Sequence, residues 1–136
     1  MIKGLTVTHG GIGTELVKVV GQILGPQLDL GSLSNQGRSA RDLVEQIQAW
    51  LLVAEPHDGV VIFVDDYGGS CASSAQLACG QNPRVVILGG INLAMLLGFA
   101  TWRESLALSE LAQKLVQKGR EAIARIGSPP RDGAAR

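Results

Sequence analysis

Val7-Thr8-His9-Gly10-Gly11 joins the first apolar run of the chain to its first helical pattern. We predict a strand over residues 2–7 and a helix from Gly13 onward, so that His9 lies in the turn at the strand's carboxyl end. Ligands bind at that edge in open α/β sheets, and imidazole takes up and releases small groups near neutral pH. His9 is therefore the predicted chemical centre, and a loop histidine without a role is the alternative.

Residues 59–64 form a continuous apolar, β-branched run, Gly-Val-Val-Ile-Phe-Val. Such a run is typical of a central parallel strand that is covered on both faces. It is followed by Asp65-Asp66-Tyr67-Gly68-Gly69-Ser70, in which Ser70 is the expected N-cap of a helix over residues 71–78. If the strands over residues 2–7 and 59–64 are neighbours, His9 and Asp65 meet at one edge of the sheet.

Helical and extended patterns alternate along the rest of the chain. The first helix ends at Gly25-Pro26, and Ser39 with Asp42 resembles a capping box that opens a second helix, which Pro56 stops. The remaining predicted elements are strands at residues 28–33 and 84–88, a helix at residues 93–100 and a last helix starting near Thr101 or Ser105. This alternation predicts a three-layer α/β sandwich with a mainly parallel central sheet.

The last helix is predicted to carry one apolar stripe as far as Ile126. Gly119 lies in this stripe and indicates a close contact with another backbone. Ser128-Pro129-Pro130 begins a frayed tail, so we expect one domain over residues 1–127 and a flexible tail over residues 128–136. The apolar members of the stripe are Leu108, Leu111, Leu115, Ala122 and Ile126.

Composition narrows the class of protein. The chain has 136 residues, a formal net charge of zero and only 4% aromatic residues, which argues against a nucleic-acid partner. Cys71 and Cys79 show neither a disulfide framework nor metal-ligand spacing, so both are expected to be reduced thiols used mostly in packing.

Residues 85–101 approach membrane-spanning length, but Gly89-Gly90 and Asn92 interrupt them, which favours a strand, a turn and a buried helix. No signal peptide is indicated at the start, and we expect a cytoplasmic protein.

Three edge motifs in succession resemble the mannose-type enzyme IIA of the bacterial phosphotransferase system. They are Val7-Thr8-His9-Gly10, the stretch Val64-Asp65-Asp66-Tyr67-Gly68-Gly69-Ser70, and Ile-Leu-Gly-Gly-Ile-Asn-Leu-Ala-Met-Leu at residues 87–96, with Gly119-Arg120-Glu121 matching a similar family tripeptide. The resemblance covers residues 2–126. It implies a parallel α/β sandwich that forms a homodimer by exchanging a C-terminal strand.

The resemblance also implies a phosphoryl relay. HPr, phosphorylated from phosphoenolpyruvate by enzyme I, would donate to His9, which would pass the group to an enzyme IIB in sugar uptake or a regulatory relay. Asp65 matches the family's aspartate that holds the active imidazole. Gly68, Gly69 and Ser70 can offer backbone N–H groups to the phosphoryl oxygens at a helix start. The relay is expected to need no metal or cofactor, and the protein is expected to associate with the membrane only indirectly, through a transporter complex.

Several positions leave alternatives open. Asp66 stands where the family often has an uncharged residue, and it is either an exposed turn residue or a second charge that weakens phosphoryl acceptance. Tyr67 and Asn92 are assigned with Asp66 to the partner surface, although Tyr67 could simply cover its loop and Asn92 could simply form a turn. Cys71 replaces a frequent proline of the family, and His57 is expected to be a solvated turn residue.

The competing function is a regulatory interaction module with the same fold and slow or vestigial phosphorylation. The two functions make different demands on Asp66: an efficient carrier requires its carboxylate to point away from His9, whereas a tuned regulator does not.

Overall fold

Strands and helices alternate in the computed structural model, which describes residues 1–56 and 58–133. The elements are β1 (Lys3–Thr8), α1 (Ile12–Leu24), β2 (Leu30–Ser34), α2 (Ala40–Ala54), β3 (Val60–Val64), α3 (Ser70–Cys79), β4 (Val85–Gly89), α4 (Leu93–Trp102) and α5 (Leu108–Glu121). The α/β class is therefore confirmed. His57, predicted to lie in a solvated turn, is outside the described residues.

The four strands form one parallel sheet in the order β2-β1-β3-β4. Strands β1 and β3 are hydrogen-bonded neighbours, and Val7 lies opposite Val64 in their register. The condition under which His9 and Asp65 were expected to meet at one edge of the sheet is therefore fulfilled. Because parallel strands end at the same edge of a sheet, the residues that follow Val7 and Val64 emerge side by side.

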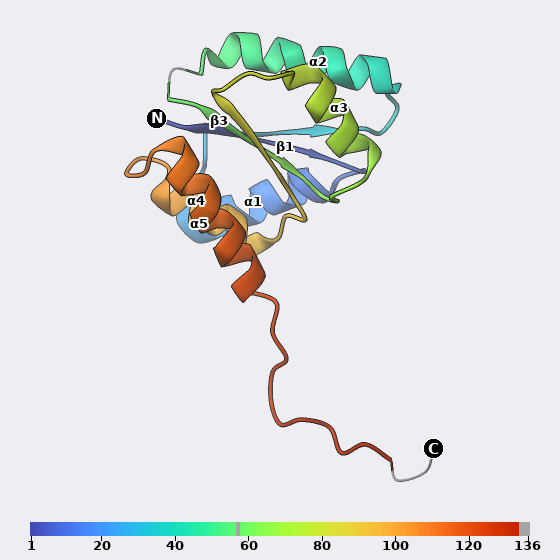
Figure 1. Ribbon diagram of the computed structural model, residues 1–136, viewed down its shortest axis with the longest axis vertical. Helices are drawn as coiled ribbons and strands as arrows, with labels where there is room; N and C mark the ends of the chain where they lie inside the picture. The colour runs from blue at the N-terminus through green and yellow to red at the C-terminus, as the bar shows by residue number, and fades with distance from the viewer. Residues whose placement is uncertain (57, 134–136) are drawn as a thin grey trace.

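Helices cover both faces of the sheet, as Figure 1 shows, with α2 and α3 on one face and α1, α4 and α5 on the other. Strand β3 is fully buried, and its residues alternate between two cores. Val61 and Phe63 pack with the helices of the second face, whereas Ile62 and Val64 pack with those of the first. The predicted three-layer sandwich is confirmed, including a central strand that is covered on both sides.

The predicted capping box at the start of α2 is present. The Ser39 hydroxyl accepts from the backbone N–H of Asp42 at 3.1 Å, and the Asp42 carboxylate accepts from the backbone N–H of Ser39 at 3.4 Å. At the other end, Glu55 adopts a left-handed conformation with φ of 46° immediately before Pro56. Local sequence therefore defines both ends of this helix.

The apolar stretch over residues 85–101 divides between β4 and α4, as predicted. Asn92 is the N-cap of α4 and accepts from the backbone N–H of Met95 at 3.0 Å. Among the helices of the described residues, none combines the length and apolar character that a membrane span requires.

The prediction for the last helix was wrong at both ends. Helix α4 continues to Trp102, and the last helix, α5, begins only at Leu108 and ends at Glu121. Ala122 is its C-cap, and Ile126 is 94% exposed beyond it, so the part of the stripe that follows Glu121 is not buried by the described chain. Residues 122–133 form an exposed tail that leads away from the body (Figure 1).

Gly119 makes a close contact, but with side chains rather than with another backbone. A Cβ atom at this position would lie 2.9 Å from the Met95 Cε atom, and the Asn92 side-chain N–H donates to the Gly119 carbonyl at 2.9 Å. The glycine thus lets α5 approach α4. Within residues 1–56 and 58–133 no strand follows β4, so strand exchange stays a prediction.

Candidate functional site

His9 occupies the turn between β1 and α1, where it was predicted, and its side chain is 46% exposed. Gly10 has a φ of 55°, which turns the chain sharply after the histidine. Three hydrogen bonds hold the turn: Gly13 N–H donates to the Thr8 hydroxyl at 2.9 Å, Gly10 N–H donates to the Asn35 side-chain oxygen at 3.2 Å, and Asn35 N–H donates to the Thr8 carbonyl at 3.0 Å. The imidazole is therefore presented to solvent from a fixed backbone.

Asp65 follows β3 and holds the histidine at two points. Its Oδ2 atom accepts from the His9 backbone N–H at 2.8 Å and from the ring Nδ1 at 2.9 Å. Burial raises the pKa of the Asp65 carboxyl, but the backbone and ring hydrogen bonds from His9 lower it further than burial raises it. Its pKa lies below the ordinary value, so the carboxylate is ionised at neutral pH and can act only as an acceptor.

This contact defines the tautomer of the ring. A carboxylate that accepts from Nδ1 keeps the proton there and leaves the lone pair of Nε2 free. The Ser70 hydroxyl lies 3.2 Å from Nε2. The nucleophilic nitrogen of His9 thus faces the start of α3 and not Asp65.

Ser70 itself differs from its prediction. Gly69 is the N-cap of α3, Ser70 is the first helical residue, and no side chain caps this end. A glycine suits the cap position because a Cβ atom on Gly69 would lie 3.3 Å from the His9 Cε1 atom, tighter than an ordinary contact, so the ring would have to shift. The Ser70 hydroxyl is consequently directed to the imidazole instead of to its own helix.

The first turn of α3 can bind an anion. Its backbone N–H groups lack partners within the helix, and the helix dipole adds partial positive charge at the same end. Gly68, Gly69 and Ser70 all precede or open this turn. A phosphoryl group on Nε2 would therefore have donors beside it, in the arrangement by which helix starts bind phosphate.

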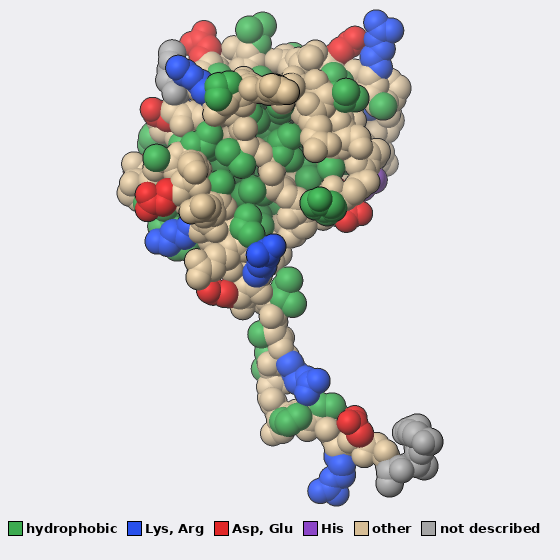
Figure 2. Space-filling view, in the orientation of Figure 1, with side chains coloured by type: hydrophobic (Ala, Val, Ile, Leu, Met, Phe, Trp, Pro, Cys, Tyr) green, Lys and Arg blue, Asp and Glu red, His purple; other side chains and the backbone are tan. Residues whose placement is uncertain are grey.

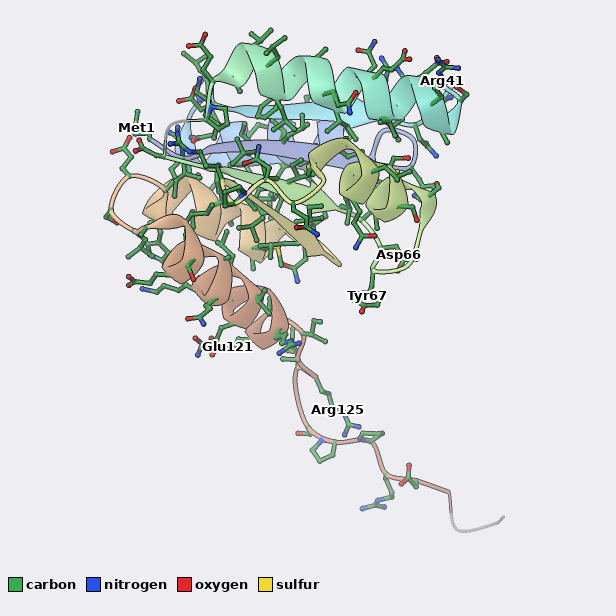
Figure 3. The ribbon with its side chains drawn as sticks, turned by 45° about the horizontal axis from the view of Figure 1, so that its top comes forward. Met1, Arg41, Asp66, Tyr67, Glu121 and Arg125 are labelled. Carbon is green, nitrogen blue, oxygen red and sulfur yellow. The ribbon has the colours of Figure 1, made fainter. Side chains whose placement is uncertain are left out.

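Asp66 and Tyr67 lie in the loop between β3 and α3, and Figure 3 shows Tyr67 projecting from it. Tyr67 is 91% exposed and free to contact a partner. A Cβ atom on Gly69, which would contact His9, would also lie 3.8 Å from the Asp66 Oδ2 atom. The Asp66 carboxylate and the imidazole thus both lie beside Gly69, without a hydrogen bond between them among the described contacts.

Asn92 lies on the loop after β4, but its amide is already used within the fold. It accepts from Met95 and donates to Gly119, which ties the start of α4 to the end of α5. This agrees with the interpretation of Asn92 as a turn-forming residue, and its place on a partner surface stays a prediction.

Two residues near His9 were not singled out as site residues by sequence. Asn35 follows β2 at the same sheet edge and bonds the His9 turn; its only signal was its position after a predicted strand. Cys71, the second residue of α3, places its Sγ atom 3.8 Å from His9 Nδ1. Burial raises the pKa of its thiol to about 11, and Asp65 raises it as well, so the free thiol is protonated at neutral pH.

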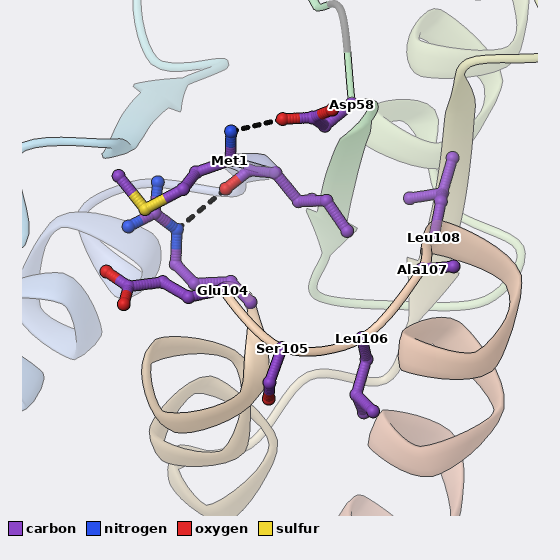
Figure 4. Close-up of a pocket in the computed structure, with 9 residues that line it drawn as sticks. Met1, Asp58, Glu104, Ser105, Leu106, Ala107 and Leu108 are labelled. Atoms are coloured by element: carbon purple, nitrogen blue, oxygen red, sulfur yellow. Dashed lines mark hydrogen bonds and ion pairs between the residues drawn. The ribbon is translucent and has the colours of Figure 1, made fainter.

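A hollow lies at the other end of the molecule. It is lined by Met1, Ile2, Asp58 and residues 103–108 (Figure 4), and Figure 3 shows Met1 at the end of the body opposite Asp66 and Tyr67. The Arg103 guanidinium there donates to the Ile2 carbonyl at 2.7 Å and to Asp29 at 2.6 Å, and the Met1 amino group pairs with Asp58. These contacts join the amino ends of β1 and β3 to the α4–α5 loop, so we interpret them as structural.

Several known proteins are similar to this chain in sequence and in fold. The protein family described as PTS system fructose IIA component matches residues 5–116. The mannose-specific EIIAB component of the phosphotransferase system (PTS) of Escherichia coli (strain K12) is 28% identical over 130 residues, 94% of this chain and 40% of that protein. The fructose-specific EIIA component of Bacillus subtilis (strain 168) is 30% identical over 117 residues, 85% of this chain and 80% of that protein.

A solved structure agrees with these relatives. The mannose/sorbose specific IIA subunit from Enterococcus faecalis superimposes with a TM-score of 0.83 and 25% identity, over 96% of this chain and 98% of that chain. This chain spans only about 40% of the length of the Escherichia coli relative. It belongs to the mannose- and fructose-type enzyme IIA family of the phosphotransferase system.

Proposed function

We propose that this chain is a phosphocarrier that accepts a phosphoryl group from phosphorylated HPr on Nε2 of His9 and passes it to an enzyme IIB. The observation that carries the proposal is the pair of contacts around one ring: Asp65 accepts from Nδ1, and Nε2 faces the Ser70 hydroxyl at the start of α3. Family membership supports the identity of the two partners, and we place the relay in the cytoplasm beside a membrane transporter.

In the accepting step, the Nε2 lone pair attacks phosphorus while the bond from phosphorus to the HPr donor breaks and returns its electron pair to the donor. The ring gains positive character as the new bond forms, and the Asp65 carboxylate stabilises it through the Nδ1 hydrogen bond. Backbone N–H groups at the start of α3 orient the phosphoryl oxygens. Such transfers depend mostly on positioning and electrostatics.

In the donating step, a nucleophile of enzyme IIB attacks phosphorus, and the electron pair of the broken bond returns to Nε2. The Asp65 carboxylate beside the ring favours this direction, because it repels the phosphoryl group that the helix start attracts. Tyr67 and Asp66, exposed on the same loop, are proposed to contact both partners in turn.

The proposal is tested by incubating the protein with labelled phosphoenolpyruvate, enzyme I and HPr. We expect acid-labile labelling of the parent, no labelling of His9→Ala, and transfer of the label to a mannose-type enzyme IIB. His57→Ala is the matched control, since it removes the other histidine of the chain and should label like the parent. An acid-labile label that survives in His9→Ala would overturn the assignment.

A regulatory module is the second candidate, and the presence of a second carboxylate in the loop favours it. The Asp66 carboxylate lies beside Gly69, as the His9 ring does, and negative charge there would oppose the arrival of a negative phosphoryl group. A regulator would label slowly in the same assay and would keep its label when enzyme IIB is added. Rapid labelling and rapid loss to enzyme IIB exclude it.

A further inference from the structure

Three side chains that offer three kinds of metal ligand converge at the candidate site. They are the His9 ring, the Asp65 carboxylate and the Cys71 thiol, whose ligand atoms all lie within 4.8 Å of one another. We propose that they bind a thiophilic divalent cation, with Zn²⁺ as the preferred ion. Spacing along the chain does not indicate this site, because the ligands come from the ends of β1 and β3 and from the first turn of α3.

The distances suit zinc. With Zn–N bonds of about 2.0 Å and Zn–S bonds of about 2.3 Å, the nitrogen and sulfur of a tetrahedral site lie roughly 3.5 Å apart, and Nδ1 and Sγ are 3.8 Å apart in the structure. Nδ1 and Oδ2 are 2.9 Å apart and need to separate by only a few tenths of an ångström. The Asp65 Oδ1 atom is buried and has no hydrogen-bond partner, so the carboxylate keeps an unused ligand atom.

The kinds of ligand select the ion. Thiolate and imidazole favour zinc over magnesium and calcium, which prefer oxygen ligands. One thiolate and one carboxylate balance the charge of a divalent cation. Three protein ligands leave a fourth position open, and the partly exposed His9 ring places that position near solvent, where water can fill it.

Metal binding would change the protonation of the ring. Zn²⁺ replaces the thiol proton, which passes to buffer, and it takes the Nδ1 lone pair, so the ring proton moves from Nδ1 to Nε2. The ring remains neutral, and the nitrogen that faces Ser70 becomes a donor. A nitrogen that carries a proton has no lone pair with which to attack phosphorus, so the metal-bound form cannot be phosphorylated.

This consequence rests on the proposed function, whereas metal binding itself does not. Phosphorylation on Nε2 requires the proton on Nδ1 and therefore blocks the metal in return. Metal binding and phosphorylation are therefore mutually exclusive, because each one weakens the other to the same extent when both act on one ring.

The binding arm of the test uses Co²⁺ and Zn²⁺ on the purified protein. We expect one equivalent of Co²⁺ to produce a thiolate-to-metal charge-transfer absorption that Zn²⁺ abolishes, in the parent and in the matched control Cys79→Ala. Cys71→Ala should lack the absorption, and Asp65→Asn should bind at least tenfold more weakly, since even an outer partner of a metal ligand is worth about 10–100-fold in affinity. If Cys71→Ala does not fold, the spectra of the parent and of Cys79→Ala are sufficient, because a thiolate absorption that persists in Cys79→Ala must come from Cys71, the other cysteine of the chain.

Absence of the thiolate absorption in the parent, or its loss in Cys79→Ala but not in Cys71→Ala, overturns the site.

The functional arm uses purified phosphorylated HPr, so that any effect of the metal on enzyme I does not influence the result. One equivalent of Zn²⁺ should slow labelling of the parent at least tenfold, a chelator should restore it, and Cys71→Ala should be unaffected. Equal inhibition of parent and Cys71→Ala overturns the proposed block. If neither protein is labelled without Zn²⁺, the proposed function fails, and the spectra still decide the metal site.

Discussion

The two nitrogens of the His9 ring have different neighbours, and this difference determines the chemistry available to the residue. Nδ1 lies against a carboxylate that is largely buried, while Nε2 lies at a helix start that can bind an anion. The charge of the carboxylate matters as well as its position, because it selects the tautomer and would stabilise a phosphorylated ring in the proposed function.

We therefore expect Asp65→Asn to remain folded and to accept the phosphoryl group at least tenfold more slowly, because an amide oxygen or nitrogen cannot hold the same tautomer as firmly. Asn35→Ala serves as the comparison, since it loosens the His9 turn without removing charge. Initial rates with phosphorylated HPr measure the effect. Equal rates for Asp65→Asn and the parent would reduce Asp65 to a structural role.

Asp66 separates the two candidate functions through charge, because its carboxylate and the His9 ring both lie beside Gly69. For the proposed carrier we expect Asp66→Thr to label at about the rate of the parent, whereas in a tuned regulator Asp66→Thr should label several-fold faster at low salt. The gain should shrink at high salt, where exposed charges are screened within a few ångströms. The readout is the labelling rate of both proteins at two salt concentrations, and a gain of the same size at both would rule out repulsion.

At the scale of elements, pairing of the two apolar runs is enough to bring His9 and Asp65 together, and this could be predicted because both patterns were strong and parallel strands share an edge. Neither Cys71 nor Asn35 could be placed at the ring in this way. The direction of Cys71 depends on where α3 begins, and the expected cap at Ser70 was one residue too late. The end of α5 also escaped prediction, because the apolar stripe continues in sequence to Ile126, although the helix ends at Glu121.

The close approach of α1 to β1 depends on Gly13. A Cβ atom there would lie 2.4 Å from the Thr6 hydroxyl oxygen, so Gly13→Ala should destabilise the fold by about 1–3 kcal/mol, as overpacking does. Gly21→Ala in the same helix meets nothing closer than 3.8 Å and should instead stabilise by about 0.5–1 kcal/mol. Denaturant unfolding measures both. Similar free energies of unfolding for the two variants would show that the Thr6 side chain moves aside without destabilising the fold.

For the whole molecule, strand β4 is an open edge of the sheet. Figure 2 shows hydrophobic side chains gathered on the face where β4 runs, and Val85, Val86 and Ile87 are only half-buried. Exposed apolar edges of this kind are usually covered by another chain. The tail carries two exposed apolar residues, Ile123 and Ile126, which are suited to such pairing.

We accordingly predict a homodimer at tens of micromolar, measured by light scattering. Replacing both Ile123 and Ile126 by Asp should shift the protein toward monomer, because charges oppose burial of the tail. Gln113→Asp, at an exposed position on α5, is the control and should remain dimeric. A parent that is monomeric at this concentration would contradict the prediction.

The central claim, that Asp65 directs the phosphoryl group to one particular nitrogen of His9, can be measured directly. Protein labelled with ¹⁵N at histidine is phosphorylated by HPr, and phosphorus–nitrogen coupling is observed by NMR. The account predicts one phosphorylated ring, that of His9, with phosphorus coupled to Nε2 and a proton retained on Nδ1. Coupling to Nδ1, or to the ring of His57, would contradict it.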